Sequence, residues 1–574
     1  MDILLLVVCS VSKPYSILGN AHRRDVPVES SCVQLEPSPI CGGSGNIADS
    51  RGESCAAPTE EYPVTSTDQA ANAVAATTPS AHRRRLGVPA VTFMIIAASA
   101  PLTVLAGGVT TTFAVTGVTG VPLSFLILGV TLAIFAVGYA AMSRFVTNAG
   151  AFYSYVARGI SRPAGVGVSI VALVSYNAMQ IGVYGLFGFQ VSSLLNAKFG
   201  WDVPWWLPIL VCIALIAVLG VNRVDLSAKV LGVLVALEFV VVIVYDVAAF
   251  IVAPEGVSAE ALSPSSLFVT GIGAVFAFGI AAFMGFESAA IYGEESKDPK
   301  RTVARATYTA VGIIALFYAL SSWAMTVGSG PSKVIADATK QGPDLIFTFL
   351  STNVGVVVSD IAQLLFVTSL FASLVSFHNA VSRYFFSLGR EGVLPGWLSR
   401  VRASSGAPWA GSVTQTALAV VVIAVFAIAS VGWVPPEGAP AALFPVLTLF
   451  SWLTNSGAMG LVLLMAVVSV AVIGFFRRDR HGVGVWQRLV APVVSGVALL
   501  VVFVLILVNF NVLLTSDPTA PATATTFILP AVVIVPGILG IVWGAILKRR
   551  NPRVYAQIGH GTEETGAPEL VPED

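Results

Sequence analysis

Two acidic residues lie inside long apolar stretches of this sequence, where an uncompensated charge is costly. Glu238 lies about halfway along the apolar segment 226–252, and Glu287 lies within the segment 266–292. Ionisable residues at membrane depth normally face protein or water and belong to ion or substrate pathways. A buried carboxyl group can carry a proton, and its oxygens can also bind a hard cation. Both glutamates are therefore candidate ion-coupling residues.

Hydroxyl groups, whose oxygens could also bind a cation, occur in the apolar segment 355–387. Ser369 and Ser373 are one helical turn apart and share a face. In one scheme Glu238 carries a proton. In another, its oxygens bind sodium, a hard ion that prefers oxygen ligands. We favour proton coupling, and a purely structural Glu238 bonded to a neighbouring helix is the third alternative. Asp246, nearer the end of the segment, is expected to be solvated.

Proline and glycine interrupt two of the apolar segments. In "VTFMIIAASAPLTVLAGGVTTTF", Pro101 lacks an N–H group and disfavours helix at Ala100. In "FAFGIAAFMGFESAAIYGEESKDP", Gly285 carries a large helix penalty. A discontinuous membrane helix leaves backbone groups that can bind a substrate at the midplane. A glycine helix contact beside a buried, hydrogen-bonded Glu287 is the alternative for the second segment.

The composition requires lipid as the solvent. Of 574 residues, 56% are hydrophobic and 11% are charged, and the mean hydropathy is +0.84. A soluble chain of this size needs roughly a quarter charged residues. A bilayer core of ~30 Å needs about 20 helical residues per span. We therefore predict an all-α integral membrane protein with twelve spans, at 89–113, 121–143, 164–192, 204–221, 226–252, 266–292, 303–327, 355–387, 411–432, 441–475, 487–513 and 525–547.

Basic residues predict the orientation of these spans. With twelve spans, one side carries only Lys198, Lys333 and Lys340 between spans, whereas the other side carries clusters such as Arg83–Arg85 and Lys548–Arg550. The positive-inside rule then places both termini in the cytoplasm of a multi-pass protein of the cell membrane. Residues 1–85 are rich in Ser, Pro, Thr, Ala and Gly and are predicted to form a disordered tail.

Four stretches resemble the amino acid–polyamine–organocation (APC) permeases over roughly residues 87–555. They are "SRFVTNAGAFYSYVARGISRPAG", "GFESAAIYGEESKDPKRTVARA", "NAVSRYFFSLGREGVLPGWLSRV" and "VWQRLVAPVVSG". The resemblance implies a LeuT-type 5+5 inverted repeat with discontinuous helices 1 and 6, plus two C-terminal helices. The implied organisation is a tail at 1–85, five-helix repeats at 86–252 and 266–475, helices 11 and 12 at 485–547, and a cytoplasmic tail at 548–574.

The resemblance also implies a substrate site. Relatives bind a substrate carboxylate with amides at the break in span 1, which here fall on Leu102, Thr103 and Val104 because Pro101 has no N–H group. Relatives often place an aromatic residue six positions before Glu287, where this chain has Ala281. The candidate substrate-binding residues are Ala100, Pro101, Leu102, Thr103, Val104, Tyr176, Gln180, Phe278, Ala281, Phe283 and Gly285. Because some relatives hold an ion between spans 1 and 8, the resemblance implies that sodium would be ligated by Glu238, Ser369, Ser373 and carbonyl groups of span 1. The candidate ion-coupling residues are Glu238, Glu287, Ser369 and Ser373.

The sequence thus predicts a proton-coupled importer of an amino acid or related organic amine that works by alternating access. An amino acid or amine exchanger is the first alternative, and a non-transporting membrane sensor is the second. The expected partners are the small-molecule substrate, H⁺ or Na⁺ and the bilayer, without nucleic acid. No phosphate-binding G-x-x-x-x-G-K-[ST] loop occurs, and the five cysteines lack zinc-like spacing, so neither an enzyme nor a cofactor is expected.

Overall fold

The apolar segments of the sequence form helices, which confirms the prediction of an all-α membrane protein. A segment in lipid must pair its backbone groups internally, and a helix does so within one span. Ten helices among the described residues are long and apolar enough to cross a membrane, and no strand occurs there. The computed structural model describes residues 87–146, 152–222, 228–287, 299–403, 405–517 and 519–559. The expected tail at 1–85 and residues 560–574 of the second tail lie outside these ranges.

The long helices follow one another with short connecting elements. The first part contains α3 (Val88–Ser99), η1 (Thr103–Val109), α4 (Thr110–Thr116), α5 (Val121–Met142), α6 (Phe152–Gly159), α7 (Arg162–Phe199), α8 (Trp206–Val221) and α9 (Ala228–Val252). The middle contains η2 (Glu260–Leu262), α10 (Pro264–Leu267), α11 (Ile272–Phe283), α13 (Pro299–Ser329), α14 (Val334–Gln341), α15 (Asp344–Asn353) and α16 (Val356–Arg390). The last part contains η3 (Gly396–Ser399), α17 (Trp409–Ala429), η4 (Ala441–Leu443), η5 (Pro445–Phe450), α18 (Ser451–Arg478), η6 (Trp486–Val490), α19 (Ala491–Val508), α20 (Val512–Thr515), α21 (Ala524–Arg550) and α22 (Pro552–Gln557).

Two of the twelve expected spans form helices shorter than the hydrocarbon core. α8 has 16 residues and α11 has 12, which at 1.5 Å per residue gives roughly 24 and 18 Å. Both are apolar and lie where spans are expected. For α8 the predicted span 204–221 was already short, whereas for α11 the predicted span 266–292 was longer than the helix, because apolar residues continue beyond Phe283. For α11 the helix stops where the backbone turns at Met284 and Gly285.

The helix α7 lies at the centre of the packing. It contacts α21, α18 and α16, and 83% of its most apolar window is buried, against 22% for α17. Its start is well defined, because the Ser161 hydroxyl accepts the N–H of Ala164 and Pro163 lies in the first turn. A central helix of this kind holds the neighbouring helices at fixed positions.

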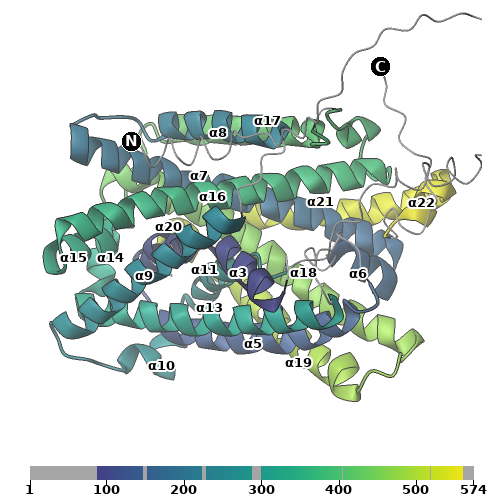
Figure 1. Ribbon diagram of the computed structural model, residues 1–574, viewed down its shortest axis with the longest axis horizontal. Helices are drawn as coiled ribbons and strands as arrows, with labels where there is room; N and C mark the ends of the chain where they lie inside the picture. The colour runs from purple at the N-terminus through teal and green to yellow at the C-terminus, as the bar shows by residue number, and fades with distance from the viewer. Residues whose placement is uncertain are drawn as a thin grey trace, which may run out of the picture. The chain divides into compact units, whose positions relative to one another are not determined.

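The interrupted helices lie in the interior of the bundle. In Figure 1, α8 and α17 run side by side at one edge, α5 and α13 lie at the opposite edge, and α3 and α11 lie between. α13 packs against α5, α9 and α3, whereas α18 packs against α7, α19 and α6. The C-terminal ends of the short helices α3 and α11, where the interruptions lie, are therefore buried within the bundle.

Glycine allows several close contacts between these helices. Gly474 of α18 lies against the backbone of Gly159 at the end of α6, where a Cβ atom on either residue would collide with main-chain atoms of the other helix. Small residues that let two backbones approach are typical of membrane helix interfaces. This contact joins α6 to α18 at the end of the bundle.

We expect Gly474→Ala to lower the stability of the purified protein by about 1–3 kcal/mol, because the added methyl group must displace the backbone of α6. Gly312→Ala in α13 is the matched control, since a Cβ atom there meets no atom within 4 Å. Thermal unfolding in detergent measures both. Equal melting temperatures for the two variants would contradict the tight α6–α18 contact.

Candidate functional site

The helix of the first span is interrupted at Ala100. α3 ends at Ser99, and Ala100 has φ 49° and ψ 77°, in the left-handed region. Pro101 begins the next helical part, a position that suits proline because the first N–H groups of a helix have no intrahelical partner. The chain then makes the π-helical turns of η1, a geometry often found at functional sites. The expected interruption at Ala100 and Pro101 is thus present in the backbone.

The helix of the sixth span is interrupted at Gly285. α11 ends at Phe283, and Gly285 has φ 104°, which glycine adopts far more readily than other residues. A Cβ atom on Gly285 would lie 2.8 Å from the Cβ atom of Ala98 at the end of α3. The second interruption therefore contacts the last turn of α3, immediately before the first interruption.

Glu238 connects the first interruption to two other helices. Its side chain is buried in α9, and its Oε2 atom accepts the N–H of Leu102 at 3.2 Å and the hydroxyl of Ser369 at 3.0 Å. The Thr103 hydroxyl donates to the Ser369 oxygen at 3.2 Å. One carboxyl group thus joins α9, the start of the second half of span 1, and α16.

Glu287 lies within the second interruption itself, two residues after Gly285. Its buried side chain accepts the N–H of Gly285 at 3.0 Å and the hydroxyl of Tyr176 on α7. The Tyr139 hydroxyl of α5 donates to its main-chain oxygen at 3.1 Å. Each interruption therefore has a freed amide that donates to a buried glutamate.

A small cavity of about 50 Å³ lies beside both interruptions. It is bounded by span 1, α5, α7, α11, α16, η5 and α18, and its walls are mostly apolar, with hydroxyl groups from Ser and Thr. None of the described residues that line it carries a charge. These residues are Ala98, Ser99, Ala100, Thr103, Val104, Gly108, Val109, Thr112, Phe125, Met179, Val183, Phe278, Ala281, Ala282, Met284, Ser373, Phe377, Phe450 and Thr454.

The structure brings some of the expected substrate-binding residues to this cavity. The expected residues in its lining are Ala100, Thr103, Val104, Phe278 and Ala281, together with Ser373 of the ion-coupling set. Ser373 donates its hydroxyl to the Leu370 carbonyl. Pro101, Leu102, Phe283 and Gly285 lie next to the cavity without lining it, and the Phe283 ring packs on Phe125 at 6.3 Å between centroids.

Two of the three amides expected to bind a carboxylate have partners within the protein. The Leu102 N–H donates to Glu238, and the Val104 N–H donates to the Ala100 carbonyl at 3.1 Å. The physical reason is that helix resumes at Pro101, so that the fourth residue after the bend already makes a helical bond. Thr103 contributes its hydroxyl to the cavity region instead.

Tyr176 and Gln180 lie outside the cavity lining, on a face of α7 that bonds other helices. Tyr176 donates to Glu287, and Gln180 accepts from Gln415 and lies 3.4 Å from the His378 ring nitrogen. In the membrane interior a buried polar group needs a protein partner, and these two find one in a neighbouring helix. Both residues therefore bond neighbouring helices, and their role as substrate contacts stays a prediction.

Sequence reasoning missed the apolar wall of the cavity. Met179 and Val183 of α7 share a face one residue away from the polar pair Tyr176 and Gln180, and Phe450 and Thr454 come from η5 and α18. The spacing of Met179 and Val183 would have revealed a shared face, but apolar residues in a membrane helix occur on every face. The residue types of Met179 and Val183 do not reveal whether they line a cavity, face lipid or pack in the core.

The expectation that Asp246 is solvated is wrong. Its side chain is buried between α9 and α13, and its Oδ2 atom accepts the Ser321 hydroxyl at 2.7 Å. The sequence pattern placed it near the end of a span, but α13 covers that end. Among the described residues, no group of three or more His, Cys, Asp or Glu side chains could hold a metal ion.

Comparison with known proteins identifies the class. The fold is similar to that of a manganese transporter from Eremococcus coleocola, solved in complex with an aromatic bis-isothiourea substituted compound. The TM-score is 0.51 and the identity 15%, and the match covers 82% of this chain and 99% of that chain. A search of curated proteins found no match. At this identity the similarity concerns the fold alone.

Residues 86–538 match the profile of the amino acid permease family, AA_permease_2. The match covers most of the chain, so this protein belongs to the amino acid permease family. It is a multi-pass membrane transporter and not an enzyme, as the sequence indicated. Its family membership implies an amino acid as the transported substrate.

Replacement of Glu238 tests the bonds at the first interruption. Glu238→Leu removes the acceptor of the Leu102 N–H and the Ser369 hydroxyl, and each orphaned donor costs about 1–3 kcal/mol. Glu238→Gln keeps an oxygen that can accept both bonds and is the matched control. We expect a clearly lower melting temperature for the leucine variant than for the glutamine variant. A leucine variant as stable as the parent protein would contradict this bonding.

Proposed function

We propose that this protein is a secondary active importer of a neutral amino acid or closely related organic amine, and that it works by alternating access coupled to protons. The observation that carries the proposal is the direct contact between Ala98 and Gly285, which belong to two interrupted helices beside the same cavity. Interrupted membrane helices place backbone dipoles where a small polar substrate can bind. A purely structural bundle has no need for either interruption.

The proposed architecture is a LeuT-type 5+5 inverted repeat with two additional C-terminal helices and both termini in the cytoplasm. The repeats comprise residues 86–252 and 266–475, helices 11 and 12 follow at 485–547, and the tails are 1–85 and 548–574. The positions of the interruptions support this division, because Ala100 and Gly285 each fall in the first span of a proposed repeat. The clustering of arginine and lysine on one side supports the orientation.

The cavity supports a substrate with a small, uncharged side chain. Phe278, Phe377 and Phe450 line it with apolar surface, and Thr103 and Ser373 lie on its wall. A cationic side chain would need an acidic partner in this low-dielectric space, and the described lining residues include none. The substrate's own ammonium and carboxylate would bind at the interruptions, where Ala100 and Ala281 leave room.

The surroundings of Glu238 support proton coupling. Its carboxyl group accepts two bonds from different helices, so protonation would weaken both bonds at once. We assign Glu238 as the proton carrier, with Ser369 of α16 bonded to it and Ser373 one turn further along α16. Sodium binding by the same oxygens is the alternative. Glu287 is assigned to the second interruption, where it couples Gly285 to Tyr176.

A thermal-shift screen of the purified protein tests the substrate class. We expect small neutral amino acids to raise the melting temperature more than polyamines or amino acids with charged side chains, because the cavity walls carry no charge. Ala281→Trp, which fills the cavity, is expected to abolish the shift while leaving the protein folded. A larger shift with polyamines than with any neutral amino acid would overturn the substrate assignment.

Reconstitution into proteoliposomes tests the coupling. An inward pH gradient alone is expected to drive accumulation by the parent protein, and Glu238→Gln is expected to abolish accumulation while ligand binding remains measurable. Asp246→Asn is the matched control, because it neutralises the other buried acid of α9 and leaves Glu238 intact. Normal gradient-driven accumulation by Glu238→Gln would remove Glu238 from the mechanism. Uptake that requires substrate on both sides would identify an exchanger.

A further inference from the structure

Four polar side chains form a buried cluster between α7, α16 and α17. They are Gln180 of α7, His378 of α16, and Ser412 and Gln415 of α17, and each is 0–2% exposed. None of the four lines the cavity beside the interruptions. Polar groups inside a membrane protein are costly unless they bond one another, and such bonds hold particular helices together.

The bonds of the cluster fix the orientation of the His378 ring. The Gln180 side-chain oxygen accepts an N–H of Gln415, so the amide nitrogen of Gln180 is the group that faces the ring. That nitrogen lies 3.4 Å from Nδ1 of His378, and the Ser412 hydroxyl oxygen lies 2.8 Å from Nε2. An amide nitrogen donates and does not accept, so Nδ1 of the neutral ring is the acceptor and Nε2 carries the hydrogen.

The packing around the ring is tight. Gly220 of α8 faces the cluster, where a Cβ atom would lie 2.7 Å from Nε2 of His378 and 2.7 Å from the Ser412 hydroxyl oxygen. α16 also contacts α7, α17 and α8. The ring therefore lies where four helices meet, and it cannot shift without moving one of them.

The bond between Gln180 and His378 lies directly behind the wall of the small cavity. Met179 precedes Gln180 in α7, Phe377 precedes His378 in α16, and both preceding residues line the cavity. The Phe377 ring packs on Tyr176 of α7, with 6.4 Å between the ring centroids. Because the cavity has only about 50 Å³, a small change in the separation of α7 and α16 changes which side chain fits it.

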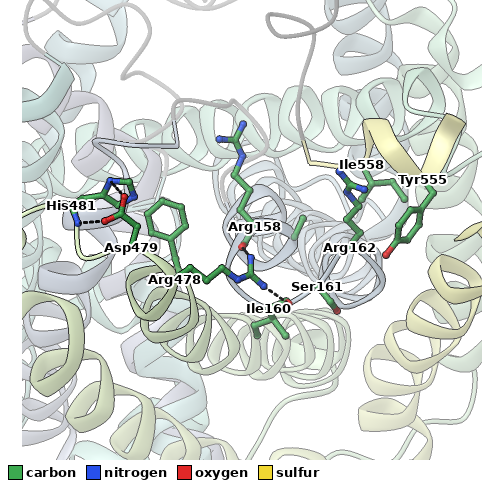
Figure 2. Close-up of a pocket in the computed structure, with 11 residues that line it drawn as sticks. Arg158, Ile160, Ser161, Arg162, Arg478, Asp479, His481, Tyr555 and Ile558 are labelled. Carbon is green, nitrogen blue, oxygen red and sulfur yellow. Dashed lines mark hydrogen bonds and ion pairs between the residues drawn. The ribbon is translucent and has the colours of Figure 1, made fainter. Parts of the chain in front are cut away.

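The cluster is remote from the larger cavity of about 550 Å³ that Figure 2 shows. Arg162, which is labelled there, is the first residue of α7, and Gln180 follows it 18 positions later, from 162 to 180. At 1.5 Å per residue the two residues lie roughly 27 Å apart along the helix. A change at His378 therefore acts first on the cavity beside the interruptions.

We propose that His378 is a positioning residue, which sets the width of the small cavity through its bond to Gln180 and so selects amino acids with small side chains. The inference rests on the proposed function for its substrate, and it names the residue that determines size selectivity. His378 acts through the walls in front of it, Phe377 and Met179, and does not line the cavity itself.

The first measurement concerns the cavity wall and needs no substrate. Full-length protein with Met179→Cys is treated with a small methanethiosulfonate reagent, and mass spectrometry follows the modification of residue 179. His378→Leu is added to remove both ring nitrogens. His378→Asn is the matched control, because its amide oxygen is bonded to Cγ, as Nδ1 is, and can accept the Gln180 N–H. We expect modification to be about fivefold faster with the leucine, the effect of one lost hydrogen bond, and unchanged with the asparagine.

The second measurement concerns size selectivity and uses the proteins without Met179→Cys. Their melting temperatures are measured during titration with alanine or leucine. We expect the parent protein and His378→Asn to bind alanine more tightly than leucine. In His378→Leu this preference is expected to fall by about fivefold, because the wall is no longer held at one separation.

The outcomes separate this inference from the proposed function. An unchanged modification rate in His378→Leu overturns the inference, and so does a rate in His378→Asn as high as in His378→Leu. A parent protein that prefers leucine to alanine, or a preference that His378→Leu leaves unchanged, also overturns it. If neither amino acid stabilises the parent, the proposed function fails, and the modification rates alone then decide the role of His378. If His378→Leu does not fold, His378→Gln replaces it, because that longer amide reaches towards Ser412 and not towards Gln180.

Discussion

A backbone N–H group freed inside a membrane must find an acceptor within the protein, and this requirement governs the centre of the structure. At the first interruption the Leu102 N–H donates to Glu238, and at the second the Gly285 N–H donates to Glu287. Each glutamate in turn accepts a hydroxyl from a neighbouring long helix, Ser369 or Tyr176. The interruptions persist because their freed amides are paired.

This arrangement ties the interruptions to different sets of helices. Glu238 holds the first interruption to α9 and α16, whereas Glu287 holds the second to α7 and, through its main chain, to α5. Under the proposed function, alternating access moves these sets relative to one another. A carboxyl group that gains a proton becomes a poorer acceptor, so a proton at Glu238 would loosen the link between span 1 and its neighbours. The coupling would then act on the backbone next to the substrate.

The parts of the fold that the sequence predicted are those with local causes. Pro101 and Gly285 interrupt helices because of their own covalent structure, and long apolar runs become spans because lipid demands it. The meeting of Glu238 with Ser369 was expected from the resemblance to a known fold, which supplies the long-range arrangement. Periodicity alone does not bring residues 131 positions apart together.

The parts that were missed depend on which helix lies opposite. Tyr176 and Gln180 form the more polar face of α7, so they suggested a substrate contact, but they bond Glu287 and Gln415. The adjacent face with Met179 and Val183 lines the cavity. Similarly, the amide of Leu102 was expected to be available for a substrate carboxylate. In the structure it donates to Glu238 instead, because α9 lies beside it. Tertiary packing determines which face of a helix lines the cavity and which group accepts a freed amide. A single sequence does not show that packing.

An experimental structure with a bound amino acid, chosen by the ligand screen, tests the central claim most directly. We expect non-helical backbone at Ala100 and Gly285, with the ligand between them and in contact with Thr103 and Ala281. Continuous helix through residues 98–108 and 279–288, with no ligand between these segments, would contradict it.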